Sequence, residues 1–262
     1  MNILITNDDG YYSPGILRLK EVISSSFNVF LCAPLSEKSA SSHSITLFKR
    51  MELKKLDEQS YAVDGTPADC VKVALLYLFK DVRFDIVISG INYGPNMGDD
   101  IFYSGTVAGA REGLLNKIFS MAISVDGWEK DKCFDTPAFF VSELIKKFER
   151  SIFSEKILLN INFPKISEPL GVKITHLGRR VYRDSIIFEN YAGKDYVTIG
   201  GDDPDFEPED DSDLQVVSEG FISITPLTNE IYDLKIIKKL SYLEGINWKS
   251  LHNSQKILKS TT

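Results

Sequence analysis

Two adjacent acids follow a short apolar run near the start of the chain. Residues 3–10 read ILITNDDG, so Asp8 and Asp9 stand side by side, where their like charges repel. When two carboxylates lie a few ångströms apart, the pKa of one of them rises unless a cation lies between them. The pair therefore indicates a site for a divalent cation. Asp-Asp-Gly is also ordinary turn chemistry, and a tight turn stays the alternative on these residues alone.

Two further polar loops supply oxygen atoms that suit the same ion. LSEKSASSHS (residues 35–44) and GINYGPNMGDD (residues 90–100) each follow a run that we expect to be a strand. Ligands of open parallel sheets bind beyond the carboxyl ends of the strands, so we expect Ser39 and Asn92 to meet Asp8 and Asp9 there. Two carboxylates, a hydroxyl and an amide carbonyl suit Mg²⁺ or Mn²⁺, whereas zinc prefers His and Cys. The sequence thus predicts one such ion per subunit.

A candidate anion site lies in YSGTVAGA, residues 103–110. Ser104 is placed to cap a helix, and Gly105 and Thr106 fall in the first turn, where free N–H groups and the helix dipole attract phosphate. The alternative is that Ser-Gly-Thr only caps the helix. We favour the phosphate site because this helix leaves the same edge as the candidate metal ligands. A divalent ion beside such N–H groups can activate water and neutralise charge on a phosphoryl group.

The segments that must position these loops alternate between strand and helix periodicity. Residues 2–6, 28–34, 84–90, 119–125 and 156–164 read as buried strands, and residues 45–56 and 60–65 alternate like antiparallel strands. Helical spacing occurs at 13–26, 66–79, 104–116 and 135–151. Thr66 is suited to the N-cap of its helix and Pro67 to its first position. We predict an α/β fold, a three-layer core in which helices cover both faces of a mostly parallel sheet.

The pattern changes after Pro164. Short strands separated by turns are expected at 171–178, 184–193, 194–201 and 220–227. The run GDDPDFEPEDDSD, residues 201–213, holds two prolines and is expected to be a solvated loop. We therefore predict one domain over 1–262: an α/β core at 1–163, a β-rich excursion with the acidic loop at 164–228, and a tail at 229–262. The tail carries enough apolar residues to pack, and a neighbouring subunit is the surface we expect.

Charge and composition exclude several classes of protein. The net charge of −7 comes from one stretch, because Asp195 to Asp233 contains twelve acids and no Lys or Arg, and the rest holds 25 acids and 30 bases. That balance argues against a nucleic-acid polymer as partner. Apolar runs are too short to cross a bilayer and the N-terminus lacks signal-peptide features, so we expect a cytoplasmic protein without a membrane partner. Cys32, Cys70 and Cys133 are predicted to be reduced core thiols.

Five motifs in order make the chain resemble the SurE family of stationary-phase survival proteins. They are ITNDDGYYSPGI, APLSEKSASSHSITL, VDGTPADCV, DIVISGINYGPNMGDDIFYSGTVAGAREG and ISITPL. The resemblance implies a Rossmann-like α/β core with a β-hairpin and a C-terminal segment exchanged between subunits, giving homodimers or homotetramers. It also implies a metal-dependent 5′-nucleotidase that acts on nucleoside 5′-monophosphates and, in some members, on 3′-monophosphates and short polyphosphate.

The resemblance further implies a set of site residues. The family's metal ligands correspond to Asp8, Asp9, Ser39 and Asn92, the four that the loop positions indicate independently. Its phosphate contacts correspond to Asn96, Ser104, Gly105 and Thr106. Either Asp8 or Asp9 is the expected proton acceptor during attack. One departure is Ala40, where family members usually carry Gly; a positive φ there would cost about 1 kcal/mol.

Other functions stay open on the sequence. His43 lies in the Ser39 loop and is a candidate proton donor to the leaving oxygen, with loop stabilisation as the alternative. A dinucleotide-binding dehydrogenase would show glycine spacing after the first strand, which NDDGYYSPG lacks. Asp8 could also be a covalent nucleophile, as in aspartyl-phosphate enzymes. In those enzymes the second acid stands two residues after the first, so the adjacent acids of this chain fit metal ligation better. A non-catalytic nucleotide sensor remains the competing hypothesis from another class.

Overall fold

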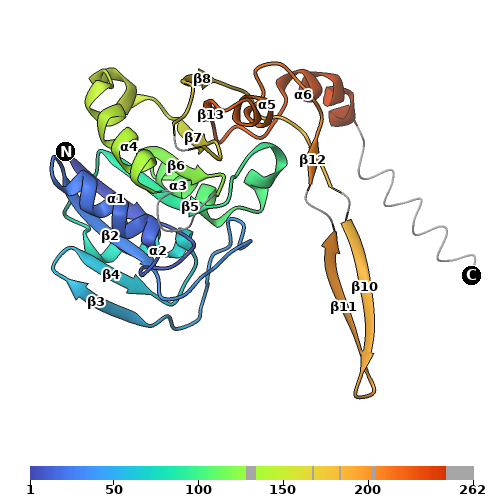
Figure 1. Cartoon of the computed structure of the whole chain (residues 1–262), viewed down its shortest axis with the longest axis horizontal. Coiled ribbons are helices and arrows are strands. Elements are labelled where there is room, and N and C mark those ends of the chain that lie inside the picture. The colour runs from blue at the N-terminus through green and yellow to red at the C-terminus, as the bar shows by residue number, and fades with distance from the viewer. Residues whose placement is uncertain (128–133, 167, 183, 202–203, 246–262) are drawn as a thin grey trace, which may run out of the picture. The chain divides into compact units, whose positions relative to one another are not determined.

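A mostly parallel sheet forms the core of residues Met1–Asn229 (Figure 1). The computed structural model describes residues 1–127, 134–166, 168–182, 184–201 and 204–245, and in these the main sheet has nine strands in the order β3-β4-β2-β1-β5-β6-β7-β13-β8. The strands are β1 (Asn2–Thr6), β2 (Asn28–Pro34), β3 (Leu53–Asp57), β4 (Ser60–Val63), β5 (Ile86–Tyr93), β6 (Phe119–Val125), β7 (Leu158–Phe163), β8 (Val172–Ile174) and β13 (Ile222–Leu227). Only the β3–β4 and β13–β7 pairs are antiparallel among them.

Helices cover both faces of this sheet. They are α1 (Pro14–Ser24) and α4 (Asp135–Lys147) on one face and α2 (Pro67–Val73) and α3 (Gly105–Leu115) on the other. Side chains of a strand alternate between faces, so Ile3 and Ile5 of β1 pack in the cluster that holds Leu19 of α1. Leu4 packs instead in the cluster that holds Val71 of α2. The predicted three-layer α/β fold is confirmed.

The strand order reverses at β1. This strand pairs in parallel with β2 on one side and with β5 on the other. The loops that follow β1 and β5 therefore diverge from a single point at the carboxyl edge of the sheet. Open α/β sheets bind ligands at such a point.

The segment after β2 departs from the expected strand at 45–56. Only Leu53–Asp57 forms a strand, at the edge of the sheet, and residues 45–52 have no regular structure. The backbone N–H of Thr46 donates to Asp69 Oδ1 at 2.9 Å, and Phe48 has a φ of 57°. These features hold the chain against the start of α2 and turn it away from the sheet.

The predicted helix at 66–79 begins as expected. Thr66 and Asp69 form a capping box, in which Asp69 N–H donates to Thr66 Oγ1 at 3.2 Å and Thr66 N–H donates to Asp69 Oδ2 at 2.9 Å. Residues Ala74–Leu78 continue it as a π-helical turn. The helix predicted at 135–151 ends at Lys147 and is followed by a 3-10 turn at Arg150–Ser154.

The β-rich segment at 164–228 is only partly an excursion. Strands β8 and β13 extend the main sheet, whereas β9 (Arg180–Val181) pairs with β12 (Asp205–Phe206) and β10 (Asp184–Tyr191) pairs with β11 (Lys194–Gly201). The acidic run is exposed at residues 204–205 and 207–211, as expected of a solvated loop. The prediction is wrong at Asp213, which is buried at the start of helix α5 (Asp213–Ser218).

The chain divides into two compact units, Met1–Asn229 and Glu230–Thr262. In the second unit, α6 (Leu234–Leu240) is capped by Asp233 and precedes a 3-10 turn at Ser241–Gly245. Packing of this tail on another subunit stays a prediction.

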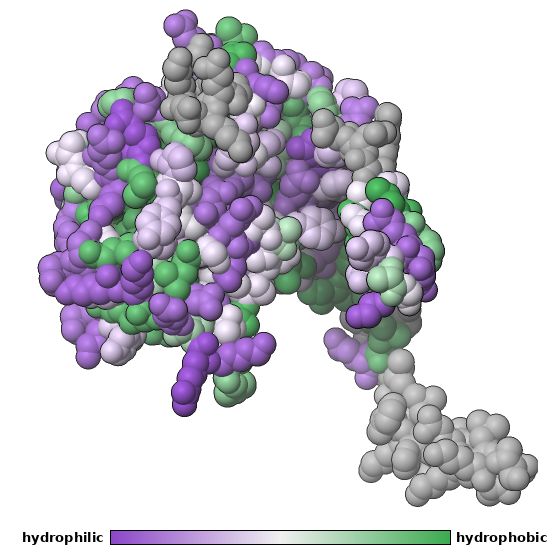
Figure 2. Space-filling model, turned by 60° about the horizontal axis from the view of Figure 1, so that its bottom comes forward, coloured by the Kyte–Doolittle hydropathy of each residue, from purple (hydrophilic) through white to green (hydrophobic). Residues whose placement is uncertain are grey.

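Cys32 and Cys70 are buried free thiols, as predicted, and Cys133 lies outside the described residues. None of the described helices is long and apolar enough to cross a membrane. The face shown in Figure 2 is mostly hydrophilic, with hydrophobic residues in small separate patches.

Candidate active site

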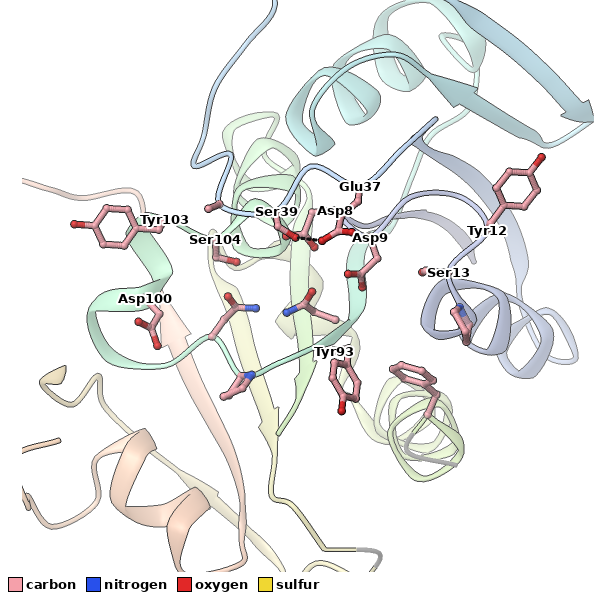
Figure 3. Close-up of a pocket in the computed structure, with 16 residues that line it drawn as sticks. Asp8, Asp9, Tyr12, Ser13, Glu37, Ser39, Tyr93, Asp100, Tyr103 and Ser104 are labelled. Atoms are coloured by element: carbon pink, nitrogen blue, oxygen red, sulfur yellow. Dashed lines mark hydrogen bonds between the residues drawn. The ribbon is translucent and has the colours of Figure 1, made fainter. Parts of the chain in front are cut away.

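A cavity of about 750 Å³ opens at the carboxyl edge of the sheet, where the strand order reverses (Figure 3). Six of the predicted site residues line it: Asp8, Asp9, Ser39, Asn92, Asn96 and Ser104. They come from the ends of β1, β2 and β5 and from the start of α3. The expectation that these loops meet at one edge is therefore met.

The turn after β1 brings both acids to the cavity. Asn7 is fully buried, and its side-chain amide donates to Gly10 O at 2.9 Å and to Ser13 Oγ at 2.8 Å. Gly10 has a φ of +94°, which an L side chain rarely adopts. Because the strand has ended at Thr6, Asp8 and Asp9 do not point to opposite faces. Both carboxylates line the cavity.

Asp8 is held by the N-terminus of α3. Its side chain is buried, and Thr106 Oγ1 donates to its Oδ1 at 2.5 Å. A Cβ at Gly105 would lie 2.8 Å from Asp8 Cβ, so only glycine permits this approach. Gly105 and Thr106 are absent from the residues that line the cavity and contact Asp8 instead. Their predicted phosphate contacts stay predictions, whereas their contact with Asp8 is a role that the sequence did not indicate.

The cavity is strongly acidic. Asp8, Asp9, Glu37 and Asp100 line it, and its described lining contains no Lys, Arg or His. Burial, together with the neighbouring charges of Asp8 and Glu37, raises the pKa of Asp9 to about 7. Burial also raises the pKa of Asp8, against the hydrogen bond from Thr106. Glu37 was missed from the sequence, although it stands two residues before Ser39 in the same polar loop.

The other two predicted ligands are oriented by neighbours. Ser39 Oγ donates to Glu37 Oε1 at 2.7 Å, and Figure 3 shows both side chains beside Asp8 and Asp9. The amide nitrogen of Asn92 donates to Gly94 O at 2.7 Å. This contact directs the amide nitrogen to the backbone and leaves the side-chain carbonyl oxygen as the atom that can ligate a cation.

The oxygen atoms at this edge fit a hard divalent cation. Two carboxylates, a hydroxyl and an amide carbonyl are the ligands that Mg²⁺ and Mn²⁺ prefer. No group of three or more His, Cys, Asp or Glu side chains suited to a metal occurs in the described part of the chain. The predicted ligand set contains two residues of these types, Asp8 and Asp9, and its other two members are a serine and an asparagine.

Asn96 and Ser104, the other two predicted phosphate contacts, line the same cavity. The amide nitrogen of Asn96 donates to Ser124 Oγ at 2.7 Å, and its backbone N–H donates to Asn162 Oδ1 at 2.8 Å. Ser104 Oγ accepts from Val107 N–H at 3.0 Å, which confirms Ser104 as the N-cap of α3. Both residues are thus fixed by the protein before any ligand binds.

His43 does not line the cavity. Its Nε2 lies 3.0 Å from Glu112 Oε2, and Glu112 is buried in α3. This placement favours the alternative role, in which His43 stabilises its loop. Its role as proton donor stays a prediction.

Asp100 connects the cavity to the β-rich segment, and the sequence did not indicate it. It lies in a 3-10 turn at Gly98–Phe102, where its carboxylate accepts from Arg180 Nε at 2.8 Å and from Tyr182 OH at 2.6 Å. Burial and the hydrogen bond to Asp100 raise the pKa of Tyr182. Two residues of the β-rich segment therefore contact one residue of the cavity wall.

Comparison with known proteins gives consistent matches over most of the chain. The family model described as Survival protein SurE matches residues 3–184. A protein named 5′-nucleotidase SurE from Fervidobacterium nodosum is 40% identical, over 95% of this chain and 100% of its own. The protein of that name from Aquifex aeolicus is 37% identical, over 92% of this chain and 97% of its own. A crystal structure of SurE from Aquifex aeolicus has a TM-score of 0.82 at 36% identity, over 93% of this chain and 100% of that one. On this similarity of sequence and fold, the chain belongs to the SurE family.

Proposed function

We propose that the chain is a phosphoric monoester hydrolase that converts nucleoside 5′-monophosphates to nucleoside and phosphate. The relatives named 5′-nucleotidase SurE, 37–40% identical over more than nine tenths of the chain, support this reaction class. We propose Mg²⁺ or Mn²⁺ as the cofactor, held by Asp8, Asp9, Ser39 and Asn92. Activity on 3′-monophosphates and short polyphosphate is part of the same proposal.

One observation carries the metal requirement. Four carboxylates and no basic side chain line a cavity that must accept a phosphate carrying about two negative charges. Asp100 is paired with Arg180, but Asp8, Asp9 and Glu37 have no cationic partner among the described residues. The protein alone would therefore repel its substrate. A divalent ion held by Asp8, Asp9, Ser39 and Asn92 would remove this repulsion, and it would supply the charge that polarises a phosphoryl group and lowers the pKa of a water.

Residues of the chain bind the phosphate, hold the ion and accept a proton. Asn96 and Ser104 bind phosphate oxygens at positions that the protein has already fixed. Asp8 is buried and engaged by Thr106, so it serves as an immobile ligand. Asp9 is more exposed, and we assign it as the group that accepts the proton of the attacking water. One water is consumed, its oxygen bonds to phosphorus, the P–O5′ bond breaks, and a proton ends on the 5′-hydroxyl of the nucleoside.

Phosphate release tests this function directly. The purified chain is incubated with AMP, GMP, CMP and UMP, with 3′-AMP and with tripolyphosphate, each with Mg²⁺, with Mn²⁺ and with chelator. We expect turnover of the 5′-monophosphates that chelator abolishes and added metal restores. Tight nucleotide binding without turnover under any metal would instead support the nucleotide sensor.

We also propose that the protein acts as a homo-oligomer. The β10–β11 hairpin leaves large apolar side chains in solvent: Ile186, Ile187, Phe188, Tyr191, Val197 and Ile199 are all more than half exposed. Its strands pair with each other over their full length. Ile186, Phe188, Val197 and Ile199 share one face of the hairpin, and an exposed apolar surface of this kind marks a protein interface. Light scattering of the purified chain should give the mass of a dimer or tetramer, and a monomer at micromolar concentration would contradict the proposal.

A further inference from the structure

The loop that carries Ser39 is fastened to the rest of the protein at a few points. We call residues 36–46 the Ser39 loop. Near its start the backbone N–H of Lys38 donates to Asp8 O at 2.7 Å, and near its middle that of Ser42 donates to Tyr103 O at 2.9 Å. The segment has no regular secondary structure, so its position depends on such contacts.

The backbone of this loop adopts costly conformations. Ala40 has a φ of 52° and Ser42 a φ of 50°, in the left-handed region that favours glycine. Non-glycine residues persist in this region only where the surrounding contacts over-determine them. The loop therefore depends on contacts that hold it in this conformation, and the residue that follows Ser42 makes one of them. That residue is His43.

Glu112 provides the anchor. It lies two turns after Gly105 on α3, and its side chain is only 3% exposed. Its Oε2 lies 3.0 Å from His43 Nε2, and its Oε1 accepts from Lys72 Nζ of α2 at 2.8 Å. Oε1 also accepts from Asn116 Nδ2 at 3.2 Å. The carboxylate thus binds the Ser39 loop through Oε2, and α2 and the end of its own helix through Oε1.

The charge on Glu112 makes loss of its contact with His43 unfavourable. Burial opposes its ionisation, but hydrogen bonds from His43 and Lys72 outweigh that effect and lower its pKa, so the carboxylate is ionised at neutral pH. A buried charge is strongly unfavourable when it loses a partner. If His43 moved away, the ionised carboxylate of Glu112 would lose the partner that lies 3.0 Å from its Oε2.

We propose that Glu112 is a positioning residue for the candidate active site: by holding His43 it fixes the Ser39 loop, and so places Ser39 beside Asp8 and Asp9. The same helix that holds Asp8 through Thr106 thereby also holds the opposite loop. The part of this inference that concerns metal affinity depends on the proposed function, because it takes Ser39 as a ligand. The part that concerns the loop does not.

Three variants of the full-length chain test the inference. His43→Ala removes the loop side of the contact, Glu112→Gln weakens it, and Lys72→Met is the matched control, because it removes a different partner of the same carboxylate and leaves the loop untouched. Two readouts are measured for each. One is the Mg²⁺ concentration that gives the half-maximal thermal shift, and the other is amide hydrogen exchange at Ser42.

We expect His43→Ala to raise the Mg²⁺ concentration for the half-maximal shift roughly tenfold, the loss typical of a residue that orients a metal ligand. Exchange at Ser42 should accelerate by a similar factor. Glu112→Gln should shift both readouts in the same direction, and combining it with His43→Ala should add little. Lys72→Met also takes a partner from the buried carboxylate and should lower the free energy of unfolding, but it should change each of the two readouts by less than twofold, because the His43 contact remains. Equal effects of Lys72→Met and His43→Ala would overturn the inference, since Glu112 would then act only on general stability.

The two proposals fail in different ways. If no nucleotide is hydrolysed under any metal, the proposed function fails, while exchange at Ser42 still reports on the loop. If His43→Ala lowers kcat at saturating metal with wild-type exchange at Ser42, His43 acts as a proton donor and the positioning role of Glu112 is wrong.

Discussion

Thr106 donates a hydrogen bond of 2.5 Å to Oδ1 of Asp8, although 98 residues separate the two in sequence. Thr106 has no solvent-exposed surface, so water cannot replace this contact. The bond attaches the first turn of α3 to the turn after β1. A candidate metal ligand and the N-terminus of a helix are therefore one unit, and a change in either should be felt at the other.

Replacement of Thr106 by Val tests this coupling. Valine keeps the shape of the side chain but removes the hydroxyl, so Asp8 loses its donor while the packing is retained. We expect Mg²⁺ affinity to fall roughly tenfold, because partners that orient a metal ligand have effects of that size. Calorimetric titration with Mg²⁺ measures it.

Thr6→Val is the matched control for that variant. Thr6 is also fully buried, but its hydroxyl has no hydrogen-bond partner among the described residues. Its replacement should leave Mg²⁺ affinity unchanged and cost no stability, since no bond is lost. Equal affinities in the Thr106→Val and wild-type proteins would show that the Thr106 hydroxyl does not orient Asp8.

The stability of the metal-free protein should depend on pH through Asp9. The pKa of Asp9 is raised to about 7 by burial and by Asp8, from a usual value of about 4 in unfolded chains. Between these values the folded state binds more protons than the unfolded state. The free energy of unfolding should therefore be highest below pH 4 with respect to this group, and fall as the pH rises to 7. Solvent screening limits the effect to the order of 1 kcal/mol.

Urea denaturation in chelator at pH 5 and pH 7.5 measures this change. Asp9→Asn cannot titrate, so its unfolding free energy should fall less over the same interval. Saturating Mg²⁺ should stabilise the wild-type protein at pH 7.5, by about 2.7 kcal/mol when the ion exceeds its dissociation constant a hundredfold. A wild-type profile as flat as that of Asp9→Asn would refute the assigned electrostatics.

The framework of the fold could be predicted because its signals are local. The apolar run at 2–6 and the helical spacing at 13–26 can each be recognised within their own segment. The cap at Thr66 is local as well, because its partner Asp69 lies only three residues further along the chain. Parallel pairing then follows from alternation of strand and helix. The convergence of Asp8, Ser39 and Asn92 also followed, because carboxyl ends of parallel strands share one edge.

The contacts that hold the site in place could not be predicted, since they join distant segments. Glu112 reads as one more helical acid until the fold brings His43 and Lys72 to it. Asp213 reads as part of a solvated acidic run, yet it is buried and accepts from the N–H groups of Gly98 and Gly178 at 2.9 and 2.8 Å. Periodicity contains no information about such partners.

Ala40 meets the condition under which the sequence predicted strain. Its φ is 52°, in the region where a Cβ is unfavourable. Ala40→Gly should therefore raise the free energy of unfolding, by up to about 1 kcal/mol after the added freedom of glycine in the unfolded chain is subtracted. Ala138→Gly, inside α4, should lower it by about 1 kcal/mol or more. Urea midpoints of both variants decide the matter, and a lower midpoint for Ala40→Gly would contradict the expected relief of strain.

Gly105→Ala separates the geometry of the site from the stability of the helix. Gly105 is the first residue of α3, where alanine suits the backbone better than glycine. However, the added Cβ would lie 2.8 Å from Asp8 Cβ and 2.8 Å from Ser41 Oγ, so Asp8 must move. A displacement of about 1 Å at a reacting centre can cost 100-fold in rate. We expect kcat/KM for AMP to fall by about that factor, with an unfolding free energy within about 1 kcal/mol of wild type.

Gly113→Ala is the contrasting change on the same helix. Its Cβ would lie 2.6 Å from Val87 Cβ and 2.6 Å from Ser120 Oγ, in the core and away from the cavity. Overpacking of this kind costs typically 1–3 kcal/mol, so this variant should lose stability and keep its Mg²⁺ requirement and kcat/KM while folded. The two variants should therefore show opposite effects: Gly105→Ala lowers kcat/KM and keeps its stability, whereas Gly113→Ala loses stability and keeps its kcat/KM. Wild-type kcat/KM in Gly105→Ala would mean that the close approach of α3 to Asp8 has no role in the reaction.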